Sequence, residues 1–201
     1  MSICLIAGGL YITSTNAWKL LQGYALFQFG QFKEQKQTAN EKNASGAAKA
    51  AEPKTKAEEI NATFQTGEKI GDLVIPKIGA ELPIYHGTDE DELEKGVGHY
   101  AGSVLPGEND NSVLAGHRDT VFRKLGEVGE GDKLIVKASY GTFTYKVKKV
   151  RIVDSDDRTI IVPKPRATLT LSTCYPFDFI GSAPERYVLV ANLEEHKKPA
   201  D

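Results

Sequence analysis

Cysteine is scarce in this sequence, and that scarcity excludes several classes of protein. The 201 residues include two cysteines, Cys4 and Cys174, and Cys4 lies in an apolar N-terminal run. We therefore expect no disulfide between them, and one remaining cysteine cannot build a zinc site of the usual Cys and His spacing. The net charge of −2 gives no electrostatic basis for binding nucleic acid. The sequence also lacks a G-x-S-x-G nucleophile elbow and a glycine-rich phosphate loop.

Composition divides the chain into three parts. Residues 1–30 are mostly apolar, with Trp18 and Lys19 as an interfacial pair, and we expect them to form an N-terminal membrane anchor. The alternative for this part is a buried or amphipathic helix. Residues 31–65 are rich in Ala, Lys, Glu, Asn and Thr, which predicts a polar stalk that buries little surface. Residues 66–197 have the pattern of a folded domain.

The folded part reads as a series of short strands separated by turn residues. Many short strands at regular spacing predict a closed β-barrel or a sandwich. Tyr140-Gly141 between two alternating runs predicts a hairpin, and Thr120–Gly126 is expected to be a short helix. The expected strands are Asp72–Ile75, Leu82–Tyr85, Ser112–Ala115, Lys133–Ala138, Thr142–Val153, Thr168–Thr173 and Arg186–Leu193.

Cys174 is the first candidate for chemistry, because it ends the strand-like segment TLTLSTC. A thiol at a strand end can face a groove while the strand fixes its backbone. As a nucleophile it needs a partner that favours the thiolate. The alternative is a buried free cysteine that packs as a small hydrophobe.

Histidine and arginine supply the candidate partners. His117 ends the run SVLAGH, where an imidazole beside a groove can act as acid and base near pH 7. His86 and His99 also lie near turns and stay open as alternatives, whereas His196 lies in a charged tail. Arg186 opens the last strand and, after a hairpin-like return, would lie beside the cysteine as a donor to an oxyanion. A salt bridge or a solvated strand start is the alternative for this arginine.

Taken together, these segments resemble the sortase family. TLSTC (170–174) resembles the family's T-L-x-T-C signature, and LAGHRDTVF (114–122) resembles its histidine segment. PERYVLVA (184–191) supplies the arginine strand, and the resemblance covers about residues 66–195. The class D sortases of Bacillus-type bacteria are the most similar group, since the segment before Gly71 has no DPW- or DPF-type lid motif of class C enzymes.

The resemblance implies a fold and a catalytic set. The implied fold is mainly β, an eight-stranded sortase-type barrel with short helices, preceded by the membrane helix and the stalk. Cys174 would be the nucleophile, His117 the general acid and base, and Arg186 the residue that stabilises substrate and oxyanion. The implied enzyme is a cysteine transpeptidase, a thiol protease by chemistry, that sits in the cell membrane by a single helix with its catalytic domain outside a Gram-positive cell.

The resemblance also implies how substrates are bound. The enzyme would cleave an LPxT[G/A]-type sorting motif after Thr and join the protein to an amine of the cell wall, from lipid II or peptidoglycan. Thr173 is expected to touch the oxyanion. The segment 154–166 would wall the groove, and its apolar residues would meet the Leu-Pro part of the motif. These substrate-binding candidates are Ile160, Ile161 and Val162.

Two other functions use the same residues. A cysteine peptidase would let water resolve the thioester, and a non-catalytic surface barrel would bury Cys174 as an inert thiol. We expect no cofactor and no metal ligands. The acidic residues Asp154, Asp156 and Asp157 share one loop, which is more typical of a solvated loop than of a calcium site. The residue after Thr, the acceptor amine and the anchored proteins are left open by the sequence.

Overall fold

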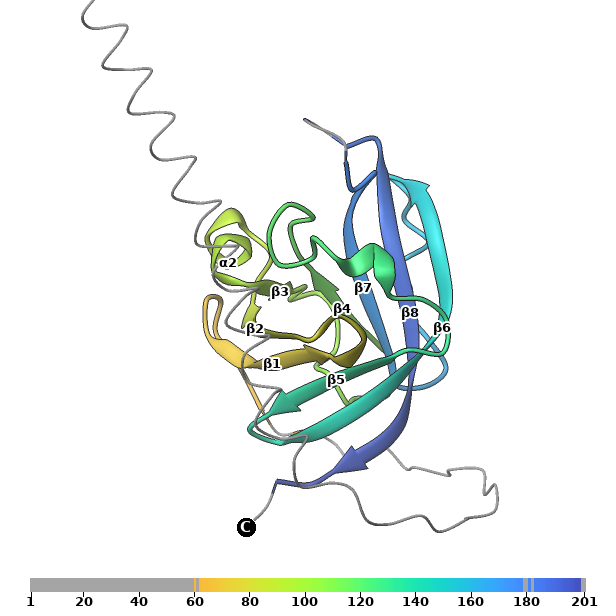
Figure 1. Cartoon of the computed structure of the whole chain (residues 1–201). Coiled ribbons are helices and arrows are strands. Elements are labelled where there is room, and N and C mark those ends of the chain that lie inside the picture. The colour runs from red at the N-terminus through yellow and green to blue at the C-terminus, as the bar shows by residue number, and fades with distance from the viewer. Residues whose placement is uncertain (1–59, 61, 179–180, 182, 200–201) are drawn as a thin grey trace, which may run out of the picture.

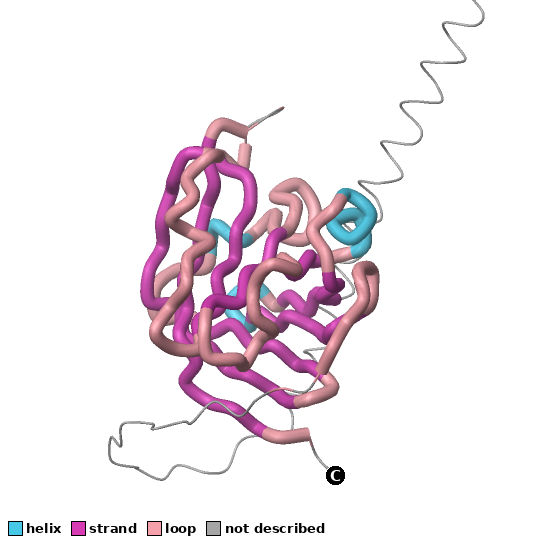
Figure 2. The backbone as a smooth tube through the Cα atoms, turned by 180° about the vertical axis from the view of Figure 1, so that it is seen from behind, coloured by secondary structure: helices cyan, strands magenta, loops and turns pink. Residues whose placement is uncertain are grey.

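A computed structural model describes residues 60, 62–178, 181 and 183–199. Strands dominate this part of the chain, and the helical segments are short (Figures 1 and 2). The elements in chain order are β1 (Lys69–Ile75), η1 (Pro76–Ile78), β2 (Ala80–His86), α2 (Glu90–Lys95), β3 (Val97–His99), β4 (Asn111–Ala115), η2 (Leu125–Glu127), β5 (Lys133–Ala138), β6 (Gly141–Asp154), β7 (Thr168–Tyr175) and β8 (Glu185–Lys197).

The eight strands close into one barrel in the order β1-β2-β3-β4-β7-β8-β6-β5. Most neighbours are antiparallel, but β2 with β3 and β4 with β7 are parallel. The β4–β7 pair matters most for function, because it joins segments far apart in the chain, Asn111 beside Thr168. Since β8 pairs with β7 on its other side, β4, β7 and β8 form a continuous three-strand surface.

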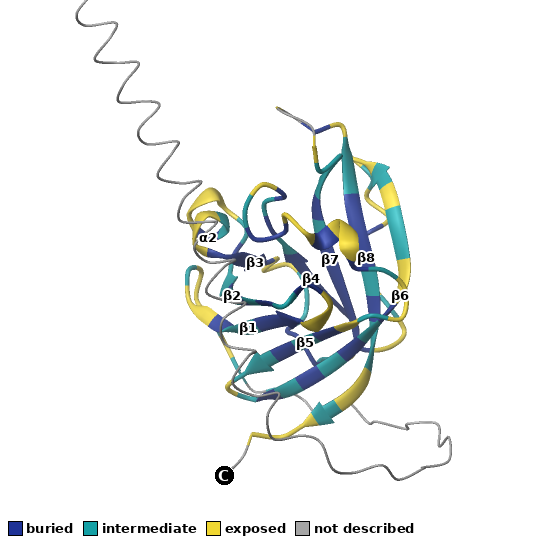
Figure 3. Ribbon diagram, viewed as in Figure 1, coloured by how far each residue is buried: buried dark blue, intermediate teal, exposed yellow. Residues whose placement is uncertain are grey.

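The interior of the barrel follows from the alternation of residues along each strand. In β5 and β6 buried residues alternate with more exposed ones, as the banding in Figure 3 shows. A strand with period-two burial lays one face on the core and the other toward solvent. The core consists mainly of large apolar side chains with almost no exposed surface. Among them are Leu73, Ile75, Leu82, Ile84, Leu114, Leu134, Val136, Phe143, Tyr145, Leu169, Leu171 and Leu189.

The structure confirms the eight-stranded barrel. The bounds of seven of its strands lie close to those expected from the sequence. The expected hairpin is present, with Ala138 opposite Gly141 in the β5–β6 pair. Strand β3 and helix α2 were not anticipated, because three and six residues are too short to show a clear period. The helix expected at Thr120–Gly126 is wrong: this segment forms successive turns and then the 3₁₀ turn η2.

The N-terminal expectations fall largely outside the described residues. The anchor (1–30) lies there entirely, and so does the stalk as far as residue 59. Among the residues that the structure describes, no helix is long and apolar enough to cross a membrane. Ile60, Ala62 and Phe64 pack against the barrel core. The last part of the segment expected to be a stalk therefore contributes to the folded domain.

Candidate active site on strands β4, β7 and β8

Cys174 and Arg186 lie directly opposite each other on neighbouring strands. The antiparallel register of β7 and β8 pairs Cys174 with Arg186. Residues opposed in this way project from the same face of the sheet, with Cα atoms about 4.5–5.5 Å apart. Cys174 is half-buried and has no disulfide partner among the described cysteines. The expected return of the chain thus places the guanidinium-bearing residue beside the thiol-bearing one.

His117 reaches the same end of the barrel from strand β4. The parallel register of β4 and β7 pairs Ala115 with Ser172, and the Gly116 amide donates to the Ser172 carbonyl at 3.3 Å. His117 follows Gly116 as Cys174 follows Thr173, so continuing this register brings His117, just beyond the end of β4, to the level of Cys174 near the end of β7. The His117 side chain is 37% exposed, and its Nε2 lies 3.8 Å from Glu90 Oε1 of α2. The site is therefore open to solvent on the histidine side.

The Arg186 guanidinium is held at the start of β8. Its Nη1 donates to the Ala183 carbonyl at 3.2 Å and to the Glu185 carbonyl at 2.9 Å. Both bonds use one nitrogen of a planar group that carries five N–H donors. These two bonds orient the guanidinium through Nη1 alone. Nη2 and Nε take no part in them, which suits a role as a donor to a substrate oxygen.

The connection from β6 to β7 covers one side of this surface. Ile161 and Val162 are 48% and 36% exposed, whereas Ile160 is 9% exposed. The first two thus present apolar surface to solvent, as expected of a wall that contacts an apolar peptide, whereas Ile160 is buried. The buried side chain of Asn111 fixes this wall, because its Nδ2 donates to the carbonyls of Ile160 and Val162, each at 3.1 Å.

Asn111 was missed by the sequence reasoning. Its Oδ1 also accepts the Thr170 hydroxyl at 2.7 Å, so the amide joins β4, β7 and the wall. The signal was weak: a polar residue just before an apolar strand is as typical of a turn as of a buried clamp. Only the partners across the barrel distinguish the two.

Thr173 does not share the face of Cys174. Its side chain is 3% exposed, and its hydroxyl donates to the Gly116 carbonyl at 2.7 Å. Successive residues of a strand point to opposite faces, so the neighbour of an outward-facing Cys174 points inward. The Thr173 hydroxyl is thus engaged inside the barrel, and this geometry gives no support to its expected contact with an oxyanion. The residue instead connects the end of β7 to the end of β4.

The remaining histidines lie elsewhere in the barrel. His86 and His99 are register partners on β2 and β3, with their Nδ1 atoms 3.1 Å apart. His99 is fully buried and its Nε2 is 2.9 Å from the Val104 carbonyl. Burial lowers the pKa of His99 below its usual value; the hydrogen bond with the Val104 carbonyl opposes this effect, and the charge of His86 adds to it. His196 stacks on Phe143 with ring centroids 4.6 Å apart. Of the four histidines, His117 is the one that the register places beside Cys174.

The acidic loop beyond β6 is used internally. Arg151 Nη2 lies 3.1 Å from Asp157 Oδ2, and Asp157 Oδ1 accepts the Thr159 amide at 2.7 Å. Hydrogen bonds from the side chain and the backbone amide of Thr159, with the charge of Arg151, hold the pKa of Asp157 below its usual value. Within the described part of the chain, no three His, Cys, Asp or Glu side chains are grouped so as to hold a metal ion.

Comparison with known proteins agrees with this geometry. A family model for the sortase domain matches residues 73–194. Sortase D of Bacillus subtilis (strain 168) is 45% identical over 188 residues, which is 92% of this chain and 93% of that protein. Sortase A of Bacillus anthracis is 27% identical over 141 residues, covering 68% of this chain and 65% of its own length.

Solved structures show the same relationship. The catalytic domain of B. anthracis SrtD is 40% identical, with a TM-score of 0.59, and the match covers 72% of this chain and 99% of that domain. The SrtA sortase from Actinomyces oris has a TM-score of 0.66 at 29% identity, covering 72% and 89% of the two chains. Sortases are cysteine transpeptidases that anchor proteins to the cell wall. The chain belongs to the sortase family of cysteine transpeptidases, and within that family it groups with the class D enzymes.

Proposed function

We propose that Cys174, His117 and Arg186 are the nucleophile, the general acid and base, and the oxyanion donor of this transpeptidase. The observation that carries the proposal is the register: Cys174 opposes Arg186 across β7 and β8, and Ala115 opposes Ser172 across β4 and β7. Three chemically distinct side chains thus come from three adjacent strand ends. That combination suits acyl transfer through a thioester.

In the first half of the reaction, the Cys174 thiolate attacks the backbone carbonyl carbon of Thr in the sorting motif. Arg186 donates to the oxygen that becomes negative in the tetrahedral intermediate. The carbon–nitrogen bond then breaks, and protonated His117 gives its proton to the departing amine. The products are a thioacyl enzyme and the released C-terminal peptide.

In the second half, an amine of a cell-wall peptide attacks the thioester carbonyl. His117 takes the proton from the attacking amine, the carbon–sulfur bond breaks, and the Cys174 thiolate is restored. The new amide bond links Thr of the sorted protein to the acceptor. Water would give hydrolysis instead, so a groove that retains the motif and admits the more nucleophilic amine favours transfer.

The proposed substrate is a protein with an LPxT-type sorting motif followed by Gly or Ala. Support comes from the exposed apolar pair on the wall, Ile161 and Val162, which offers a surface for the Leu-Pro part of such a motif. Buried Ile160 shapes the wall from beneath. The proposed acceptor is a peptide amine of lipid II or peptidoglycan. We further propose that residues 1–30 anchor the enzyme in the membrane, with residues 31–59 as a stalk and the barrel outside the cell.

The direct test incubates the full-length chain, purified in detergent, with LPxTG and LPxTA peptides and a panel of amines, with products identified by mass spectrometry. We expect a product in which the amine is joined to Thr. Cys174→Ala should form neither thioester nor transfer product while its circular dichroism spectrum is retained. Hydrolysis products alone, at every amine concentration, would show a peptidase and contradict the transpeptidase proposal.

The partners of Cys174 are tested by substitution in the same assay. His117→Ala should lower kcat/KM by ~100-fold or more, as for a positioned acid–base group. Arg186→Ala should cost ~100- to 1,000-fold, as for one oxyanion donor. Arg186→Lys should not fully restore the rate, because an ammonium cannot reproduce the planar fork. His86→Ala, on β2, serves as the histidine control and should be much milder.

A further inference from the structure

The residues on either side of His117 are hydrogen-bonded to residues on either side of Cys174. Before the histidine, the Gly116 carbonyl accepts the Thr173 hydroxyl at 2.7 Å. After the histidine, Arg118 Nη1 donates to the Pro176 carbonyl at 2.9 Å. Two side chains, one from each segment, thus cross between the histidine segment and the cysteine strand.

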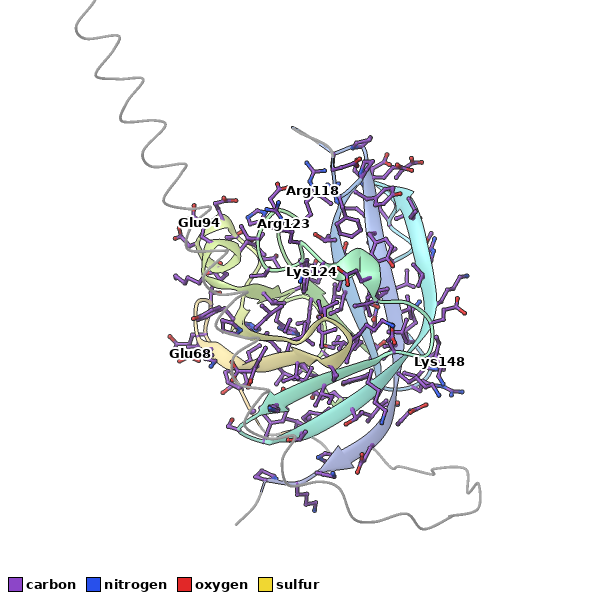
Figure 4. The ribbon with its side chains drawn as sticks, viewed as in Figure 1. Glu68, Glu94, Arg118, Arg123, Lys124 and Lys148 are labelled. Carbon is purple, nitrogen blue, oxygen red and sulfur yellow. The ribbon has the colours of Figure 1, made fainter. Side chains whose placement is uncertain are left out.

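Arg118 is buried although its guanidinium is charged. Its side chain is 4% exposed, and it lies between the segment after β4 and the end of the barrel where β7 ends and β8 begins (Figure 4). Nη2 donates to the Gly181 carbonyl at 2.9 Å, and Nε lies 3.5 Å from Asp119 Oδ1. Burying a cation is costly unless hydrogen bonds compensate it. The planar fork of arginine suits two carbonyl acceptors that come from different points of one loop.

The sheet brings His117 and Cys174 to the same level, but strand pairing does not reach His117 and so does not set the spacing of the two side chains. The paired part of β4 ends at Ala115, and the backbone bond from Gly116 to Ser172 comes just before the two residues that matter. Beyond that bond, His117 belongs to a turn segment, in which its carbonyl accepts the Phe122 amide at 3.1 Å. The spacing between imidazole and thiol therefore depends on side-chain links across the gap.

We propose that Arg118 and Thr173 form a brace that sets the spacing and orientation of His117 and Cys174. Both are positioning residues, since each contacts the flanking backbone and neither is placed to touch substrate. The inference rests on the proposed roles of Cys174 and His117. Because proton transfer and attack depend on near-contact geometry, loosening the brace should slow the chemical steps more than it weakens substrate binding.

The experiment uses the full-length chain in a Cys4→Ser background, so that Cys174 is its single thiol. The variants are Arg118→Met, Arg118→Lys, Thr173→Val and the double variant Arg118→Met with Thr173→Val. Arg123→Met is the matched control, because Arg123 is an exposed arginine of the same segment (Figure 4). The readouts are the pH profile of Cys174 alkylation by iodoacetamide, kcat and KM for peptide transfer, and the melting temperature.

Alkylation reports the thiolate, so its pH profile reports the coupling of Cys174 to His117 without any sorting peptide. We expect His117→Ala to shift this profile, and Arg118→Met and Thr173→Val to shift it part of the way toward that of His117→Ala. The kcat of each should fall ~10- to 100-fold, as for small misplacement of reacting groups, with a smaller change in KM. Arg118→Lys should be intermediate, the double variant most affected, and Arg123→Met unchanged.

Two results would overturn the brace, and they are distinguishable. If Arg118→Met and Thr173→Val lower the melting temperature but keep the wild-type profile and kcat, the two residues are merely structural. If His117→Ala leaves the profile and the transfer rate unchanged, the catalytic assignment fails and the brace fails with it. Should Arg118→Met not fold, Arg118→Lys and Thr173→Val, which retain the charge and the side-chain volume respectively, decide the question.

Discussion

The substitution Asn111→Ala should lower the unfolding free energy of the barrel and weaken its binding of an LPxT-type peptide. The side chain is 5% exposed and makes three hydrogen bonds: to the Ile160 carbonyl at 3.1 Å, to the Val162 carbonyl at 3.1 Å and from the Thr170 hydroxyl at 2.7 Å. Asn111→Ala leaves these three groups without their partner. The amide also ties the wall to the strands that carry His117 and Cys174, so its loss frees the wall.

The magnitude follows from the burial of the partners. The Ile160 carbonyl and the Thr170 hydroxyl bond to Asn111 in buried surroundings, whereas the Val162 bond is partly exposed. Each buried group left unsatisfied costs ~1–3 kcal/mol, and the wall can shift to reach water, so we expect a loss of about 3 kcal/mol in unfolding free energy. For a chain of this size that corresponds to a fall of roughly 6–12 °C in melting temperature.

Peptide kinetics give the functional readout. Losing the ordered apolar wall should cost about as much as one poorly buried aliphatic side chain, ~1.5 kcal/mol, or roughly tenfold in KM for an LPxT-type peptide. The exposed Asn109, two residues earlier, provides the matched control, and Asn109→Ala should change stability by less than ~0.5 kcal/mol. A melting temperature of Asn111→Ala equal to that of Asn109→Ala, or a kcat loss at unchanged KM, would refute the reasoning.

Two further predictions concern the barrel itself. Gly107 has φ +102°, and an added Cβ would overlap the Phe143 ring, so Gly107→Ala should lower the unfolding free energy by ~3 kcal/mol or more in urea titrations. Gly129→Ala, with open space around its Cβ, is the control and should be nearly neutral. Equal urea midpoints for the two variants would contradict this prediction. Burial lowers the pKa of His99 below 6.5, so the unfolded chain takes up this proton more readily than the folded one. Stability should therefore fall as pH drops through 6.5 and below, and His99→Gln should flatten that part of the stability profile; an unchanged slope would show that His99 is not responsible.

The strands could be predicted from the sequence because each wall of the barrel has one buried and one exposed face. Period-two burial in β5 and β6 and the apolar runs of β7 and β8 mark strands whatever their neighbours are. The expected helix at Thr120–Gly126 failed for the opposite reason. Val121, Phe122 and Leu125 have a helix-like spacing, but they are buried by packing of a turn segment onto the barrel. Tertiary contacts overrode the local pattern there.

The sequence by itself determined the mainly β class, and it supplied the candidate reactive groups. The cysteine at the end of the strand-like segment TLSTC and the histidine at the end of SVLAGH can be identified from the local sequence, without knowing which strands pair. The tertiary structure decided which groups meet. The β4–β7 register brings the His117 segment, and not His86 or His99, to the level of Cys174, and the closed barrel turns Thr173 inward and gives Asn111 and Arg118 their acceptors. These are pairings between residues more than forty positions apart, and a hydrogen bond across such a distance exists only once the closed barrel fixes both of its ends.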